Sequence, residues 1–176
     1  GCAEDAALST CGYEASPRDA YPGDPAGLEE CDILANHSFS TADGSTLTLQ
    51  DIRSDSSNQL LLLSTSAGWC TACIEEQPEL EDRHQEWADR GLVILVALFE
   101  DSNFEPADAS LAGSWQAQYG LPFQVVVDTP FVLGDYYDSS LTPMNMFVDL
   151  DTMEIIRISI GWDSSLADAI IAAYLE

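Results

Sequence analysis

Residues 59–66, "QLLLLSTS", form a short apolar run that leaves few choices of fold. The run is too short for a helix, and its leucines follow one another instead of alternating with polar residues. This pattern is typical of a strand that is buried on both faces in the interior of a sheet. The sequence therefore predicts a sheet that other elements cover on both sides.

A helical pattern follows the run, from Thr71 to about Arg90. Gly91 provides a stop signal, and Pro78 is expected to kink the helix. The residues that fall near one helical face are Ile74, Leu80, His84 and Trp87.

Later segments continue the alternation of strands and helices. Strands are expected at 92–99, 123–128, 144–150 and 154–160, and helices at 108–120 and 164–175. Ahead of the buried run, "FSTADGSTLTLQDI" alternates around an Asp-Gly pair, which predicts a β-hairpin. Together these patterns indicate an α/β structure with a mainly parallel central sheet, flanking helices and an added N-terminal hairpin.

The first 36 residues differ from the rest of the chain. They are rich in Ala, Pro, Gly, Asp and Glu, show no helical or strand periodicity, and contain three of the five cysteines. We therefore expect an N-terminal extension or tether at residues 1–36 and one domain at residues 37–176.

The chain is strongly acidic, with a formal charge of −26 from 31 acidic residues, five arginines and no lysine. Such a surface repels nucleic acid and anionic membranes, so neither is expected as a partner. The charge is explained by a solvated acidic surface that keeps the protein soluble, and the alternative is that the acidic residues serve to bind a basic partner. The longest apolar run, "GLVILVALF" at 91–99, is too short to span a bilayer.

Cys70 and Cys73 form a Cys-x-x-Cys pair where the buried strand gives way to the helix. The free N–H groups and the dipole of a helix N-terminus favour a thiolate at Cys70. The spacing puts Cys73 one turn further along, within reach of a disulfide, and Trp69 would shield one side of the pair. The arrangement predicts a dithiol for disulfide exchange, with Cys70 as the nucleophile and Cys73 as the resolving sulfur.

The segment "WCTACIEEQP" resembles the active-site segment of the thioredoxin fold, in which a proline, here Pro78, follows Trp-Cys-x-x-Cys. Thr142-Pro143 falls where thioredoxin-like proteins carry the cis-proline that faces the cysteine pair. The front hairpin and the spacing of Glu76 and Pro78 are similar to the TlpA/ResA-like group of exported, often membrane-anchored thiol-disulfide oxidoreductases.

This resemblance covers roughly residues 37–176 and implies a thioredoxin-like fold. It also implies exchange of disulfides with protein clients and an upstream redox partner that returns the pair to its starting state. No cofactor is expected. Thr142-Pro143 would align the backbone of the client beside Cys70.

The chain departs from the thioredoxin pattern near the cysteines. Many thioredoxins carry a buried acidic residue six positions before the first cysteine, where this chain has Ser64. Deprotonation of Cys73 would then rely on Glu76, on water, or on no assisting group. Glu76 is also open to a simpler interpretation, as an acid that stabilises the first turns of a helix.

Gly1-Cys2 resembles the end of a bacterial lipobox, in which the cysteine carries a lipid anchor. Cys11 and Cys31 would then form a structural disulfide that staples the extension. The alternative pairs Cys2 with Cys11 or Cys31 and leaves one thiol free. The lipoprotein interpretation predicts an exported protein of the periplasm or cell envelope, held at the membrane only through Cys2.

Other functions fit these residues less well. A peroxiredoxin-like peroxidase would need Pro-x-x-x-Thr/Ser-x-x-Cys, but this chain has Leu63 at the position of the proline and Ala67 at the position of the Thr or Ser. A copper chaperone would need a downstream histidine, which the sequence after position 84 lacks, and structural zinc would need a second ligand pair. No metal site is therefore expected. The main alternative is a non-enzymatic binding lipoprotein that holds an extended chain between Trp69 and Thr142-Pro143.

Overall fold

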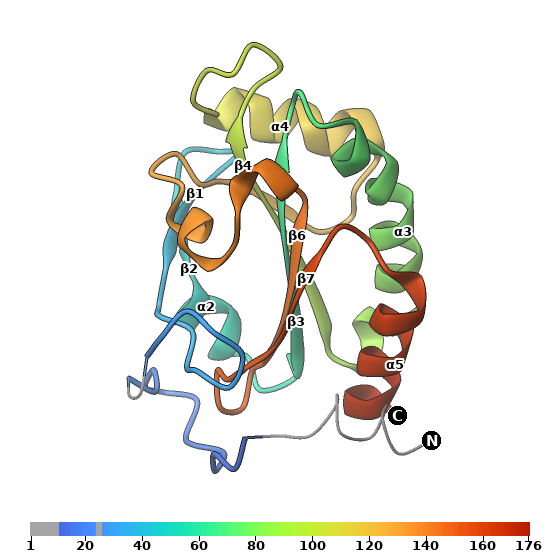
Figure 1. Ribbon diagram of the computed structural model, residues 1–176. Helices are drawn as coiled ribbons and strands as arrows, with labels where there is room; N and C mark the ends of the chain where they lie inside the picture. The colour runs from blue at the N-terminus through green and yellow to red at the C-terminus, as the bar shows by residue number, and fades with distance from the viewer. Residues whose placement is uncertain (1–10, 24–25) are drawn as a thin grey trace.

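The computed structural model describes residues 11–23 and 26–176, and its centre is a seven-stranded sheet (Figure 1). The strands lie in the order β2-β1-β5-β4-β3-β6-β7, so β4 and β3 occupy the middle. They are β1 (Ser38–Thr41), β2 (Thr46–Thr48), β3 (Leu60–Ala67), β4 (Leu92–Glu100), β5 (Gln124–Val127), β6 (Met144–Asp149) and β7 (Ile155–Ile160).

Helices contribute to the apolar layers on both faces of this sheet. One layer includes side chains of α3 (Thr71–Trp87), α4 (Ala109–Tyr119) and α5 (Ser164–Leu175), and the other includes α2 (Leu49–Arg53). Three short 3-10 turns are η1 (Ala88–Arg90), η2 (Val132–Tyr136) and η3 (Ser139–Leu141). Across residues 11–23 and 26–176, none of the helices has the length and apolar composition needed to cross a bilayer. The structure confirms the predicted α/β architecture.

The sheet is mixed rather than mainly parallel, which corrects one detail of the prediction. Parallel pairing is confined to β3, β4 and β5. β6 pairs antiparallel with both β3 and β7, and β1 pairs antiparallel with β2 and β5. The turn at residues 150–154 that joins β6 to β7 is too short for the crossover that parallel strands require.

The predicted hairpin is present but ends earlier than the alternating pattern suggests. β1 and β2 pair around the Asp-Gly turn, and the chain then enters α2 at Leu49. The Thr48 side chain accepts a hydrogen bond from the N–H of Asp51, whose carboxylate accepts one from the N–H of Thr48. This capping box starts a helix within the predicted strand, and Leu49 and Ile52 are buried as a result.

β3 joins the two apolar layers. Leu60 and Leu62 belong to the layer with α3, α4 and α5, whereas Leu61 and Leu63 belong to the layer with α2. Every residue of β3 is buried, so the predicted strand with two buried faces is confirmed. This packing fixes the end of β3, where the chain leaves the sheet for α3.

The segment before residue 37 packs against the sheet where the structure describes it. Ile33 and Leu34 are buried in the layer with α2. Arg53, fully buried at the end of α2, donates hydrogen bonds to backbone carbonyl oxygens of this segment, those of Ser16, Pro17 and Ala20. The boundary between residues 36 and 37 stays a prediction, but these contacts hold the preceding residues on the domain.

Candidate active site

Cys70 and Cys73 lie where β3 gives way to α3, at the carboxyl end of the parallel strands. Gly68 and Trp69 carry the chain round to Cys70, which caps α3. A Cβ atom at Gly68 would lie 2.6 Å from the backbone nitrogen of Ser102. Only glycine therefore lets this turn pass so close to the loop that follows β4.

The sulfur atoms of Cys70 and Cys73 lie 2.26 Å apart, close to disulfide distance, and their Cα atoms lie 5.2 Å apart. The backbone N–H of Cys73 donates to Sγ of Cys70, with 3.1 Å between nitrogen and sulfur. This contact would stabilise a Cys70 thiolate once the pair is reduced. Cys70 is 4% exposed and Cys73 is 0% exposed, so a partner reaches the sulfur of Cys70 first.

Thr142 and Pro143 lie beside the cysteines and are joined by a cis peptide bond. The carbonyl oxygen of Thr142 is 3.7 Å from Sγ of Cys70, although the two residues are 72 positions apart. Hydroxyl groups anchor this loop to the sheet. The Tyr137 hydroxyl is 2.8 Å from Oγ1 of Thr142 and 3.0 Å from Oγ1 of Thr65 on β3.

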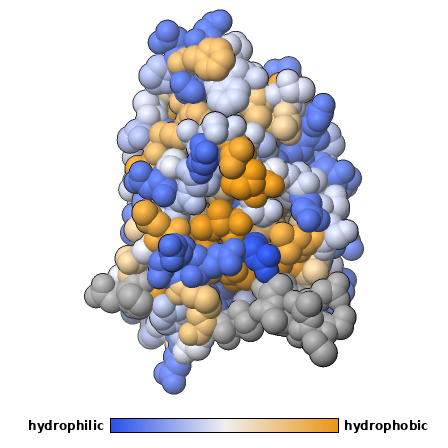
Figure 2. All heavy atoms as spheres, in the orientation of Figure 1, coloured by the Kyte–Doolittle hydropathy of each residue, from blue (hydrophilic) through white to orange (hydrophobic). Residues whose placement is uncertain are grey.

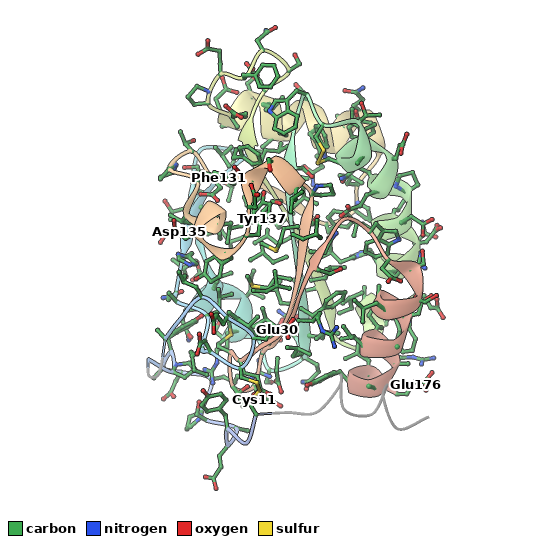
Figure 3. The ribbon with its side chains drawn as sticks, in the orientation of Figure 1. Cys11, Glu30, Phe131, Asp135, Tyr137 and Glu176 are labelled. Carbon is green, nitrogen blue, oxygen red and sulfur yellow. A yellow bond between two sulfur atoms is a disulfide. The ribbon has the colours of Figure 1, made fainter. Side chains whose placement is uncertain are left out.

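Tyr137 is a further residue of the site, and its place there is visible only in the structure. It lies just after η2, near Phe131, with 6.2 Å between the ring centroids (Figure 3). Burial raises the pKa of its hydroxyl, which therefore stays protonated at neutral pH. No motif or periodicity marks this segment, so only the contacts with Thr65 and Thr142 reveal its place in the site.

Glu76 lies one turn after Cys73 and is 2% exposed. The hydroxyl of Ser64 donates a hydrogen bond of 2.7 Å to its Oε1, while Oε2 has no hydrogen-bond partner among the residues that the structure describes. Burial raises the pKa of Glu76 to about 7, and the side chains of Ser64 and Asn145 lower it only in part. Glu76 is therefore unlike the exposed acids that usually stabilise a helix start.

A pocket of about 310 Å³ opens beside the cis-proline. We call it the acidic pocket, and its lining residues are Ala72, Glu75, Glu76, Glu79, Pro143 and Trp162. Ala72 stands between the two cysteines in the sequence, so the pocket begins next to the sulfur pair.

Trp69 packs into a group of aromatic rings. Its indole stacks on Phe104, with 5.5 Å between ring centroids, and meets Phe99 edge-on. Its Nε1 donates a hydrogen bond of 3.2 Å to the carboxylate of Glu100, and Phe99 stacks on Phe131. No sequence pattern identifies Phe104 or Phe131 as site residues, because both lie in irregular segments.

The structural pair Cys11 and Cys31 lies near the start of β7. Their sulfur atoms are bonded, at 1.95 Å, and the N–H of Cys31 donates to the carbonyl oxygen of Ile155. Cys2, the predicted lipid-anchor site, lies outside the described residues. Within residues 11–23 and 26–176, no cluster of three or more His, Cys, Asp or Glu side chains is placed to hold a metal ion.

Among known proteins, the chain is similar to the thioredoxin-like protein YneN of Bacillus subtilis. The two are 28% identical over 118 residues, which make up 66% of this chain and 64% of YneN. The similarity thus spans somewhat less than two thirds of the length of this relative.

Solved structures share the fold at lower sequence identity. A protein of Chlorobium tepidum assigned as the thiol:disulfide interchange protein DsbE is 18% identical, with a TM-score of 0.67 over 84% of this chain and 99% of that one. The exposed lipoprotein thioredoxin Etrx1 of Streptococcus pneumoniae is 21% identical, with a TM-score of 0.61 over 79% of this chain and 99% of that one. The predicted thioredoxin-like fold is confirmed.

A family model matches the sequence itself. The model of the AhpC/TSA family covers residues 32–157, a range that includes Cys70, Cys73, Glu76 and Thr142-Pro143. This range is most of the chain, and it begins before the predicted domain boundary. The chain belongs to the AhpC/TSA family.

Proposed function

We propose that this protein is a thiol-disulfide oxidoreductase that exchanges disulfides with protein clients through Cys70 and Cys73. The geometry of the pair carries the proposal. The sulfur atoms of Cys70 and Cys73 lie 2.26 Å apart at a helix N-terminus, and the carbonyl oxygen of Thr142 lies 3.7 Å from Sγ of Cys70. The names of the structural neighbours, a thiol:disulfide interchange protein and a lipoprotein thioredoxin, support it.

In the reducing direction, the thiolate of Cys70 attacks one sulfur of a client disulfide and forms a mixed disulfide. The other client sulfur leaves as a thiolate and takes up a proton. Cys73 then gives up its proton and attacks Sγ of Cys70, which releases the second client sulfur as a thiolate. Two electrons have passed to the client, and an upstream dithiol reduces the Cys70–Cys73 disulfide again. In an oxidase the same steps run backwards.

We assign Glu76 to proton transfer with Cys73. Glu76 follows Cys73 by one turn of α3, and both side chains are buried. The hydrogen bond from Ser64 holds Oε1 and leaves Oε2 available to take the proton of the Cys73 thiol. Because the pKa of Glu76 is about 7, the carboxylate accepts and returns a proton readily near neutral pH. The acidic pocket that Glu76 lines would connect it with solvent.

Thr142 and Pro143 are assigned to alignment of the client. The carbonyl oxygen of Thr142 is close enough to Sγ of Cys70 to accept a hydrogen bond from a client N–H beside the reacting disulfide. The hydroxyl of Tyr137 contacts Oγ1 of Thr142 and so holds this loop in place. Trp69, which stacks on Phe104, is assigned to shield one side of the cysteine pair.

The proposal extends to location. An exported protein of the periplasm or cell envelope, with a lipid anchor at Cys2, fits the bond between Cys11 and Cys31, because structural disulfides persist in oxidising compartments. The description of Etrx1 as an exposed lipoprotein supports this placement.

Reduction of insulin disulfides, with dithiothreitol as the electron source, tests the activity. The wild-type protein should accelerate the reaction, whereas Cys70→Ser and Cys73→Ser should lose turnover. The matched control, in which Cys11 and Cys31 are both replaced by serine, should keep turnover per folded molecule. If the wild-type protein does not accelerate reduction or oxidation of protein disulfides, the proposal is wrong. A binding protein would then be favoured, or a peroxidase if the protein consumed hydroperoxide instead.

A further inference from the structure

We propose that the acidic pocket beside Cys70 binds a cationic side chain of the client, an arginine or lysine close to the client's reactive cysteine. This inference rests on the proposed function, because it names the kind of protein segment that the site takes. The pocket is defined above by its six lining residues, and Pro143 and Ala72 place it next to the sulfur pair. A side chain next to the reacting cysteine of a client can therefore enter it.

The size of the pocket suits a single side chain. Its volume of about 310 Å³ lies at the lower end of the range of ~300–1,000 Å³ that is typical of ligand pockets. Pro143 forms one wall, so a client backbone aligned along Thr142-Pro143 passes the mouth of the pocket. The occupant is therefore expected within a few residues of the client cysteine.

The charge of the pocket points to a cation. Three of the six lining side chains are carboxyl groups. Glu79 pairs with Arg83, but Glu75 is exposed and has no ion-pair partner among the residues that the structure describes. Glu76 is almost fully buried, lines the pocket, and has an Oε2 atom without a hydrogen-bond partner in the described part of the chain. A buried polar atom of this kind is a position where a ligand donor is missing.

Trp162 adds a second feature that suits a cation. The guanidinium carbon of Arg83 already lies 5.4 Å from the centroid of the indole ring. Arg83 therefore occupies one face of this ring, and a planar guanidinium of the client would have to stack on the other face while it donates to carboxylates.

The other surfaces near Cys70 are more apolar. Phe104, which stacks on Trp69, is 65% exposed, and Leu141, directly before Thr142, is 50% exposed. A client segment is therefore expected to combine apolar residues with one cationic residue, and only the position that faces the acidic pocket should favour the cation.

Peptide substrates test the proposal. Each peptide carries one cysteine in a mixed disulfide with glutathione, and an arginine is placed in turn at each of the three positions before and after that cysteine. Matched peptides carry citrulline, the uncharged isostere of arginine. At one position the arginine peptide should show about a fivefold or larger advantage in kcat/KM over its citrulline match, as expected for an ion pair with an aromatic contact.

Two variants locate the effect. Glu75→Gln should abolish most of the arginine advantage. Glu86→Gln, which removes the same charge from an exposed position on α3 that does not line the acidic pocket, should keep it. The inference is overturned if arginine and citrulline peptides react equally at all six positions, or if Glu75→Gln keeps the full advantage.

A binding measurement separates this inference from the proposed activity. Peptides with serine in place of cysteine are titrated into the oxidised wild-type protein, which needs no turnover. Tighter binding of the arginine peptide than of the citrulline peptide, lost in Glu75→Gln, would support the pocket even if the protein reduced no substrate. Equal affinities of the two peptides would count against it.

Discussion

At the scale of single residues, the buried acid of the site stands on the helix rather than on the strand. The hydroxyl of Ser64 on β3 donates to Oε1 of Glu76 on α3, at 2.7 Å. The thioredoxin pattern places an acidic residue at the position of Ser64, so the carboxyl group of Glu76 lies beside the strand position from which that acid is missing. Both residues were singled out from the sequence, but their contact depends on how α3 packs on β3, which local pattern does not reveal.

The buried carboxyl of Glu76 should make stability depend on pH. Since the folded state raises the pKa of Glu76 from 4.5 to about 7, the ionised form is disfavoured in the folded protein. The stability of the wild-type protein relative to Glu76→Gln should therefore fall as the pH rises from about 4.5 to above 7, by at most about 3 kcal/mol. Urea unfolding of both oxidised proteins at pH 5 and pH 8.5 measures it, and an equal difference at both pH values would contradict the buried, raised-pKa carboxyl.

Relocation of the acid tests its role in proton transfer. Glu76→Gln should lower kcat at neutral pH by roughly tenfold or more, with resolution by Cys73 becoming the slow step. Adding Ser64→Asp to this variant returns a carboxyl group to the same buried space and should restore part of kcat and a pH dependence. Ser64→Asn in the same background is the control without a proton acceptor, and equal rates for the aspartate and asparagine variants would count against proton transfer.

At the scale of elements, the site depends on one strand, one helix and one loop from distant parts of the chain. The ends of α5 and the start of β4 agree with the sequence predictions, because buried faces and stop signals are local patterns. The aromatic and Tyr137 contacts could not be predicted, since they join irregular segments to β3 and the cysteines. The packing of residues 26–36 has no local signal either, because the partners of Ile33 and Leu34 lie far along the chain.

Arg53 shows how the N-terminal segment is held by one element. Its fully buried guanidinium donates to backbone carbonyls of Ser16, Pro17 and Ala20, so Arg53→Leu would leave these acceptors without their donor. We expect a loss of about 2–4 kcal/mol in the free energy of unfolding, measured with urea. The exposed Arg90→Leu should cost less than about 1 kcal/mol. Equal effects of the two substitutions would contradict the anchoring role of Arg53.

At the scale of the whole molecule, the acidic surface dominates. Figure 2 shows hydrophilic residues spread over the visible face, with hydrophobic patches between them. The formal charge of −26 is carried without a single lysine, so like charges repel one another over the folded surface. The same charge would attract cationic client segments from a distance and repel nucleic acid.

Salt should stabilise the protein by screening this repulsion. The Debye length falls from ~10 Å at 0.1 M to ~3 Å at 1 M ionic strength, so the melting temperature should rise by several degrees over this range. Scanning calorimetry in sodium chloride measures the rise. A melting temperature that stays flat or falls with salt would contradict a repulsive acidic surface.

Trapping of the mixed disulfide tests most directly whether Cys70 attacks and Cys73 resolves. Reduced Cys73→Ser is incubated with a disulfide-containing client, quenched with acid and separated without reductant. Because Cys70 is the reachable sulfur and Cys73 is fully buried, this variant should accumulate a covalent complex through Cys70, identified by peptide mass, whereas Cys70→Ser should give none. A complex that forms equally well with Cys70→Ser, or full turnover by Cys73→Ser, would show that the roles are assigned wrongly.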